Sequence, residues 1–271
     1  VDVKVENAGA AINSQYDDKT PCITADGKRL VFTSRRPETT DAPMDVEGDG
    51  GFFEDIYIAT WDTTNRKWNE ADPVPGSVNT IAHDAVLSIS PDGKQIFIYL
   101  NDANGDSRGG DIYVSKVSGT KWKTPEPMGK PINSSYWEGG ACISPDGKTI
   151  YFVSDNPKYG KDKNQGQFTS DIWMVEKISK TEWGKPVNLG ADVNSPYNEQ
   201  GIFLAPDGKT LFFCSNRPES MGDFDIFKTT KVNGKWTKPV NLGYPINSAY
   251  KDGPFVVSAD PTVGYFSSER K

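Results

Sequence analysis

The sequence predicts an all-β fold, a five-bladed β-propeller of four-stranded antiparallel blades. Two observations predict it. One pattern recurs five times: a short apolar strand, a tight turn and a strand of alternating aromatic and β-branched residues. It occupies residues 23–34, 89–100, 143–154 and 204–215 and, in a less regular form, residues 257–268. The turns are spaced 66, 54, 61 and 53 residues apart, counted between Asp26, Asp92, Asp146, Asp207 and Asp260. Long repeats of variable length fit blades with variable loops better than a solenoid of fixed short period.

The turn of each hairpin is chemically suited to reverse the chain. Three copies contain Pro-Asp-Gly-Lys and a fourth contains Ala-Asp-Gly-Lys. Proline fixes φ at the first turn position, and aspartate is compatible with the backbone conformation of the second. Glycine adopts the left-handed conformation that lets the two strands pair. We therefore expect the innermost strand of each blade and its partner to form a hairpin.

Two further strands are expected after each hairpin. A third strand is marked by Asp-Ile-aromatic, at 55–57, 111–113, 171–173 and 225–227. A fourth begins at Trp68, Trp122, Trp183 or Trp236, with proline a few residues later. Proline is tolerated on an outermost strand because that strand needs no hydrogen bonds on its far side. Each repeat therefore predicts one four-stranded blade.

The N-terminal residues are expected to close the ring. An Asn-Ser or Asn-Thr pair precedes every turn Asp by 13 residues, and it places residues 1–8 in register with the outer strand 183–190. This strand would complete the final blade and remove its exposed edge. Only 11 residues follow Asp260, so the last blade is expected to be incomplete. We interpret residues 1–271 as a single propeller domain from a larger multidomain protein.

The composition excludes several functions. A net charge of −7 argues against nucleic acid as a partner, which would need a basic stripe. No apolar run is long enough to span a bilayer, and no signal peptide is recognisable. The three cysteines, Cys22, Cys142 and Cys214, are predicted to be small buried hydrophobic residues, because equivalent positions in non-neighbouring blades lie too far apart for a disulfide.

The repeated elements resemble a known family. Asn-Ser, an acidic residue, Ser-Pro-Asp-Gly-Lys, Asp-Ile-Tyr and a Trp-led outer strand together resemble the WD40-like repeat called PD40. That repeat occurs in the TolB propeller and in OmpA-family envelope proteins of Bacteroidetes, among them the peptidoglycan-linked component PorE of the type IX secretion system. The resemblance implies a periplasmic, outer-membrane-associated, non-enzymatic scaffold that contacts peptidoglycan only through a separate domain.

One acidic residue stands eight positions before each turn Asp. These five residues are candidate binding residues at one mouth of the central channel: Asp18, Asp84, Glu138, Glu199 and Asp252. Converging carboxylates would attract a cation or a basic peptide. The structural alternative, which we favour, is that each acid caps backbone N–H groups or pairs with an arginine of a neighbouring blade, such as Arg36, Arg217 or Arg270.

Aromatic residues stand two positions before four of these acids. They are Tyr16, Tyr136, Tyr197 and Tyr250, with Ala82 as the exception. Packing between blades is the favoured interpretation, and a platform for sugar or peptide is the functional alternative.

No metal ion or other cofactor is predicted. The segment from Asp102 to Asp106, followed by Asp111, is similar to the start of a calcium loop but lacks its closing glutamate. The acids within residues 37–53 are a comparable weak candidate. His83 is the only histidine, and no nucleophile motif accompanies it, so hydrolysis through histidine is not expected.

The preferred function is therefore a non-catalytic protein-binding scaffold of the cell envelope, with an envelope protein or peptide as partner. One alternative is a glycan hydrolase that uses channel carboxylates as acid and base. Catalysis, however, needs carboxylates in unlike surroundings, whereas these acids occupy equivalent positions. A propeller-shaped lectin is the remaining alternative and would require pockets repeated between blades.

Overall fold

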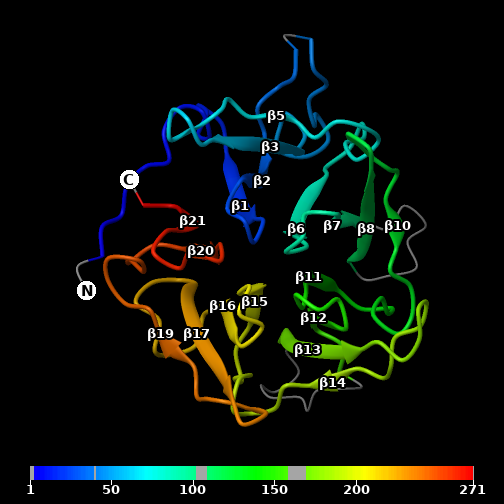
Figure 1. Cartoon of the computed structure of the whole chain (residues 1–271), viewed down its shortest axis with the longest axis vertical. Coiled ribbons are helices and arrows are strands. Elements are labelled where there is room, and N and C mark those ends of the chain that lie inside the picture. Colours follow the sequence, from blue (N-terminus) through cyan, green and yellow to red (C-terminus); the bar gives the residue numbers. More distant parts are fainter. Residues whose placement is uncertain (1–2, 40, 102–108, 158–168, 271) are drawn as a thin grey trace.

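The structure, a computed structural model, describes residues 3–39, 41–101, 109–157 and 169–270. Antiparallel sheets are arranged around a common axis (Figure 1). The described residues contain no helix, and hence none that is long and apolar enough to cross a membrane. The all-β prediction and the propeller-like arrangement of blades are confirmed.

Four sheets contain four or five strands each. The first contains β1 (Asp18–Ile23), β2 (Arg29–Ser34), β3 (Asp55–Asp62), β4 (Lys67–Trp68) and β5 (Asp72–Pro73). The second contains β6 (Ala85–Ile89), β7 (Gln95–Asn101), β8 (Gly110–Ser118), β9 (Lys121–Trp122) and β10 (Glu126–Pro127). The third contains β11 (Glu138–Ile143), β12 (Thr149–Ser154), β13 (Asp171–Glu176) and β14 (Val187–Asn188). The fourth contains β15 (Glu199–Leu204), β16 (Thr210–Ser215), β17 (Asp225–Val232), β18 (Lys235–Trp236) and β19 (Val240–Asn241).

The predicted hairpins form the inner half of every sheet. In the fifth sheet, β20 (Asp252–Val257) and β21 (Gly264–Ser268) make up the whole sheet in the described residues. Each innermost strand carries a register irregularity near its start, for example between Glu138 and Gly140. Such a bulge re-aims the first side chain of the strand. The sequence pattern did not predict these bulges.

The predicted Trp-led outer strand is broken into two short pieces in the first, second and fourth sheets. In the fourth sheet, β18 and β19 both pair with β17, and residues 237–239 separate them. Pro239 contributes to the break because proline has no N–H to donate to the neighbouring strand. Pro125 has the equivalent position between β9 and β10 in the second sheet.

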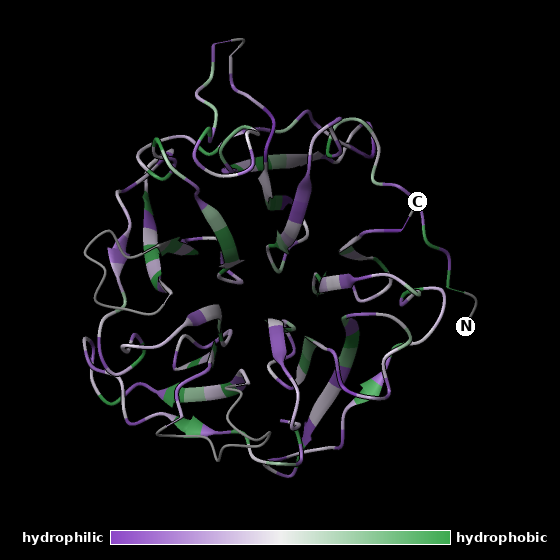
Figure 2. Cartoon of the chain, turned by 180° about the vertical axis from the view of Figure 1, so that it is seen from behind, coloured by the Kyte–Doolittle hydropathy of each residue, from purple (hydrophilic) through white to green (hydrophobic). Residues whose placement is uncertain are grey.

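The apolar core lies between neighbouring sheets. Separate clusters fill the first–second, second–third and third–fourth junctions, and one further cluster joins the fourth, fifth and first sheets. Hydrophobic residues are concentrated in the strands, whereas the connecting segments are more hydrophilic (Figure 2). Cys22, Cys142 and Cys214 are free and buried in these clusters, as predicted.

Among the described residues, the predicted closing strand does not form. Residues 3–8 are exposed and contain no strand, although they pass close to the fifth sheet (Figure 1). In the first, third and fourth sheets an outer strand pairs with the third strand. The described part of the fifth sheet has no third strand, so residues 3–8 have nothing to pair with.

The first and fifth sheets nevertheless touch each other. The N–H of Ala259 donates to the carbonyl oxygen of Ala25 at 2.8 Å, and Ala25 in turn donates to Pro91 at 2.9 Å. Side chains of β1 and β2 share one apolar cluster with residues of β20 and β21. Contact between hairpin turns and packed side chains therefore joins the two ends of the chain.

Candidate functional site

The segments that lead into β6, β11, β15 and β20 are each fastened to the preceding sheet by an asparagine. The side chain of Asn194 accepts a hydrogen bond from the N–H of Ile172 at 2.8 Å and donates to the carbonyl oxygen of Ile172 at 3.0 Å. The same two-way contact joins Asn79 to Ile56, Asn133 to Ile112 and Asn247 to Ile226. We call this contact the asparagine clamp. The repeated asparagine was recognised in the sequence, but its partner was not.

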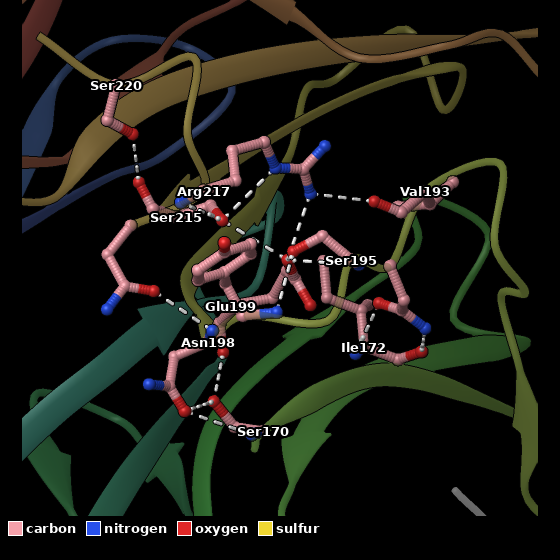
Figure 3. Close-up of polar contacts among 12 residues, drawn as sticks. Ser170, Ile172, Val193, Ser195, Asn198, Glu199, Ser215, Arg217 and Ser220 are labelled. Carbon is pink, nitrogen blue, oxygen red and sulfur yellow. Dashed lines mark hydrogen bonds and ion pairs between the residues drawn. The ribbon is translucent and has the colours of Figure 1, made fainter. Parts of the chain in front are cut away.

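The five candidate acids begin or immediately precede the innermost strands. Each accepts a hydrogen bond from the backbone N–H of a serine or threonine four residues earlier. At Glu199 the carboxylate also accepts from the hydroxyls of Ser195 and Ser215 (Figure 3). The acids therefore hold the entry segment in place, as the structural alternative predicted.

Three of these acids also form an ion pair with an arginine. The guanidinium of Arg217 lies 2.9 Å from the carboxylate of Glu199 and also donates to the carbonyl oxygen of Val193 (Figure 3). Equivalent pairs are Arg36 with Asp18 at 2.6 Å and Arg270 with Asp252 at 2.7 Å. The prediction of pairing with a neighbouring blade is wrong in one respect: each arginine follows the strand that pairs with the strand of its acid, in the same sheet.

These carboxylates are buried. Asp84, Glu138, Glu199 and Asp252 are at most 1% exposed, and the side chain of Asp18 is 7% exposed. Burial raises the pKa of Glu199 to about 7, although hydrogen bonds from Ser195 and the charge of Arg217 oppose this shift. Burial also raises the pKa of Asp84 and of Glu138. A receptor for an external cation would need accessible oxygens, so the geometry favours a structural role over a binding ring.

The four candidate tyrosines lie closer to solvent than packing between blades would require. Tyr16, Tyr197 and Tyr250 are exposed, and Tyr136 is half-buried. Tyr16 makes an edge-to-face contact with Phe52, with ring centroids 5.7 Å apart. They therefore contribute to the surface at the end of the ring where the innermost strands begin.

The connection between β2 and β3 projects outward from the ring at the top of Figure 1. We call residues 37–53 the arm. Arg35 donates to the carbonyl oxygen of Phe52 at 2.8 Å and pairs with the carboxylate of Asp49. His83 of the next sheet lies 3.2 Å from the carboxylate of Asp45. The single histidine thus braces the arm, a role that the sequence did not reveal.

Exposed apolar side chains lie at several points around the same end of the ring as the arm. The loop between the second and third strands of a sheet starts beside the acid of that sheet, because Ser34 is opposite Asp18 and Ser215 is opposite Glu199. We call this end the loop end. Its exposed large apolar residues include Tyr16, Met44, Val46, Ile81, Tyr197, Met221 and Tyr250. Val46 and Ile81 are the most exposed, at 82% and 88%.

Toward the opposite end of the innermost strands lies a small cavity. It is lined by Ile23, Ala25, Ile89, Pro91, Cys142, Ile143, Phe203, Leu204 and Pro206. Apart from the buried thiol of Cys142, these side chains carry no acid or base. Among the described residues, no group of three or more His, Cys, Asp or Glu side chains is placed to hold a metal ion. The calcium-like segment 102–106 lies outside the described residues.

The fold and the site together define a class of protein: an all-β, propeller-like ring with buried polar clamps and an exposed apolar loop end. No family model matches the chain, and no curated protein sequence matches it.

Solved structures do match. The protein assigned as TolB from Agrobacterium tumefaciens is 19% identical, with a TM-score of 0.48 over 91% of this chain and 72% of that chain. The hydrazine synthase of Kuenenia stuttgartiensis is 15% identical, with a TM-score of 0.44 over 92% of this chain and 61% of that chain. The tricorn protease is 13% identical, with a TM-score of 0.49 over 91% of this chain and 20% of that chain.

Proposed function

We propose that this chain is a non-catalytic scaffold that binds a protein partner through its loop end. The observation that carries the proposal is the set of exposed apolar residues at that end. Aromatic residues and methionine are enriched in protein interfaces. Tyr16, Met44 and Tyr250 are of these kinds.

The chemistry of the partner follows from the arm. Its five acids, Glu38, Asp41, Asp45, Glu47 and Asp49, are accompanied by no lysine or arginine within residues 37–53. Asp45 and Asp49 contact His83 and Arg35, whereas Asp41 and Glu47 are exposed. A partner surface with basic and apolar residues would complement this arm, and its binding would weaken as salt screens the charges.

Binding is preferred to catalysis because of the buried acids. Glycoside hydrolysis needs a pair of carboxylates that reach the substrate, one on each side of the scissile bond. The repeated acids are instead engaged with a serine or threonine of their entry segment and, in three cases, with an arginine. Activity assays on peptidoglycan and other envelope glycans, with Glu138→Gln and Glu199→Gln, test this part directly. Loss of a measured activity in either variant would contradict the proposal.

The repeated motifs support two further parts of the proposal. Their resemblance to PD40 supports a place in the periplasm, next to the outer membrane, in a secretion or peptidoglycan-linked assembly. The contacts of Asn7 support a fifth blade. Its Oδ1 accepts hydrogen bonds from the N–H of Gly9 and from the side-chain amide of Asn13. Asn188, in the outer strand of the third sheet, accepts the equivalent bonds from Gly190 and Asn194. We therefore propose that residues 3–8 are the outer segment of a fifth blade.

Site-specific photocrosslinking tests the loop end. A photoreactive residue would replace Val46 or Ile81 in one set of proteins, and Ile178 or Val232 in the matched control set, since these two are also exposed but lie outside the loop end. We expect the first set to crosslink one envelope protein at low salt and less of it at high salt. Equal crosslinking from both sets, or none from the first, would overturn the proposal.

A further inference from the structure

Charge is distributed unevenly between the two ends of the ring. At the loop end, the arm carries five acids and no lysine or arginine. The opposite end, which we call the turn end, holds the turns between the third and fourth strands, because the third strand of a sheet ends where the second begins. The residue pairs at this point include Lys116–Gln95, Glu176–Thr149 and Thr230–Thr210.

Three turns at the turn end are rich in lysine. They are residues 116–123 of the second sheet, 177–185 of the third and 231–238 of the fourth, and we call them together the basic arc. The basic arc contains one acid, Glu182, and nine lysines: Lys116, Lys121, Lys123, Lys177, Lys180, Lys185, Lys231, Lys235 and Lys238. The three sheets follow one another around the axis, so these turns lie side by side at the turn end (Figure 1).

The lysines of the basic arc are available to a partner. Eight of them are exposed and Lys231 is half-buried. Among the residues that the structure describes, none forms an ion pair with any of the nine. The arginines Arg36, Arg217 and Arg270 at the loop end are instead each paired with a carboxylate. The positive charge of the turn end therefore faces solvent without a counter-charge from the described chain.

The choice of lysine favours a lipid surface over a protein as the partner. The basic arc contains no arginine. Arginine is enriched in protein interfaces, where its planar group binds carboxylates with two hydrogen bonds, whereas lysine is depleted there. A layer of anionic headgroups has no fixed geometry and attracts any cation that comes close to it. Nine mobile point charges spread over three separate turns suit such a layer.

Exposed apolar side chains accompany these lysines. Ile178 is 68% exposed in the turn of the third sheet, and Val232 is 52% exposed in the turn of the fourth. Ile178 follows Lys177 directly, and Val232 follows Lys231. Basic and apolar residues on one surface are typical of binding at a membrane interface, where the apolar side chains reach below the headgroups and the charges stay among them.

We infer that the turn end binds the surface of a bilayer that contains anionic phospholipid. The basic arc lies on the headgroups, and Ile178 and Val232 enter the headgroup layer. The same surface repels the acidic arm, so the loop end faces away from the lipid and stays accessible to a protein partner. This inference goes beyond the proposed function and does not rest on it.

Cosedimentation of the whole chain with vesicles tests the inference. Vesicles of phosphatidylcholine with about 30% phosphatidylglycerol should bind the chain at low salt and release it at high salt, whereas phosphatidylcholine alone should not bind it. Replacing Lys235 and Lys238 together by glutamine should weaken binding about 25-fold, which is about fivefold or about 1 kcal/mol for each lysine. Replacing Lys130 and Lys251, which are exposed in segments that enter β11 and β20 at the loop end, is the matched control and should weaken it less than about threefold.

A fluorescent dye tests the contact of the apolar side chains. An environment-sensitive dye would be attached to the cysteine of Val232→Cys or, as the matched control, of Lys130→Cys. The native Cys22, Cys142 and Cys214 are buried and should not react. Anionic vesicles should shift the emission of the dye at position 232 to the blue and leave the dye at position 130 unchanged. Because each protein is compared with and without vesicles, the result does not depend on comparing the stability of variants.

Several outcomes would overturn the inference. One is a lack of binding to anionic vesicles at low salt, and another is equal binding to neutral ones. Equal losses in the two double variants would mean that the basic arc is not the contact. Binding of duplex DNA as tight as that of the vesicles would show attraction to any polyanion, and crosslinking of an acidic protein from position 178 or 232 would make a protein the partner. Photocrosslinking from Val46 and Ile81 uses no vesicles, so failure here is distinguishable from failure of the proposed function.

Discussion

The indole N–H of Trp68 donates a hydrogen bond to the hydroxyl of Tyr265 at 3.2 Å, although 197 residues separate them in the sequence. Their rings also meet edge to face, with centroids 5.8 Å apart. Trp68 belongs to the first sheet and Tyr265 to the fifth. This pair is therefore a direct link between the two ends of the ring.

Removing this link should weaken the contact between the first and fifth sheets. Tyr265→Phe keeps the ring contact but loses the hydrogen bond, and we expect a decrease of about 1 kcal/mol in the free energy of unfolding. Tyr244→Phe, at an exposed tyrosine, is the matched control and should change it by less than about 0.5 kcal/mol. Urea unfolding followed by tryptophan fluorescence measures both. Equal effects of the two variants would contradict a closing role for Tyr265.

The ion pair of Arg217 and Glu199 should be costly to break. Arg217→Ala leaves the carboxylate buried without its cation, and removal of one partner of a buried pair costs about 3–5 kcal/mol. Arg66→Ala, at an exposed arginine in a turn of the first sheet, is the control and should be nearly neutral. Denaturant unfolding midpoints compare the two. A loss below about 1 kcal/mol for Arg217→Ala would show that water or rearrangement compensates Glu199.

Asp55 should make stability depend on pH. Burial, followed by the charges of Glu38 and Asp84, raises the pKa of Asp55 to about 7 from an ordinary value of 3.8. The folded chain therefore holds a proton that the unfolded chain has released, and this stabilisation, complete below about pH 4, is lost as the pH rises through 7. Asp55→Asn should be more stable than the unchanged protein at pH 8, with the difference closing toward pH 4.

Asp62→Asn is the control for that pH dependence. Hydrogen bonds from the N–H and side chain of Asn65 lower the pKa of Asp62, so its contribution to stability is present at neutral pH and is lost on acidification. The two variants should therefore differ from the unchanged protein in opposite directions at pH 8. Thermal unfolding at pH 4, 6 and 8 measures this. A parallel response of both variants would contradict the assignment.

Gly76 should not tolerate a side chain. Its φ is +122°, and a Cβ there would lie 2.1 Å from the backbone oxygen of Trp122 in the next sheet. At Gly129, with φ of +65°, a Cβ would meet no atom within 4 Å. Gly129→Ala should cost about 1–3 kcal/mol from backbone strain alone. Gly76→Ala should cost more, because the first and second sheets must separate locally, and denaturant unfolding of both variants tests this order.

The local parts of the structure could be predicted from the sequence because they depend on neighbouring residues. The turn at Asp146 forms where Pro-Asp-Gly predicts it, with its carboxylate accepting from the hydroxyl of Ser144 and the N–H of Lys148. The arginine partner of Asp18 was also predicted, but it was assigned to a neighbouring blade. Pairing of β1 with β2 places Asp18 opposite Ser34, and this brings Arg36 of the same sheet next to Asp18. The spacing of the repeats does not reveal this strand register.

Contacts between sheets could not be predicted. Asn247 was visible as a repeated residue, but its partner Ile226 lies in the preceding sheet and becomes a neighbour only when the sheets are arranged around an axis. The bracing of the arm by His83 has the same origin. The exposure of Tyr197 depends on which end of the ring it occupies, and a repeating pattern does not encode that end.

The asparagine clamps have a consequence for protein synthesis. Each clamp joins an isoleucine to an asparagine that lies 21 to 23 residues later in the chain. The clamp on a sheet therefore cannot form until the ribosome has added the entry segment of the next sheet. Asn13 is the exception, since it is made first and its side chain donates to Asn7 of its own segment.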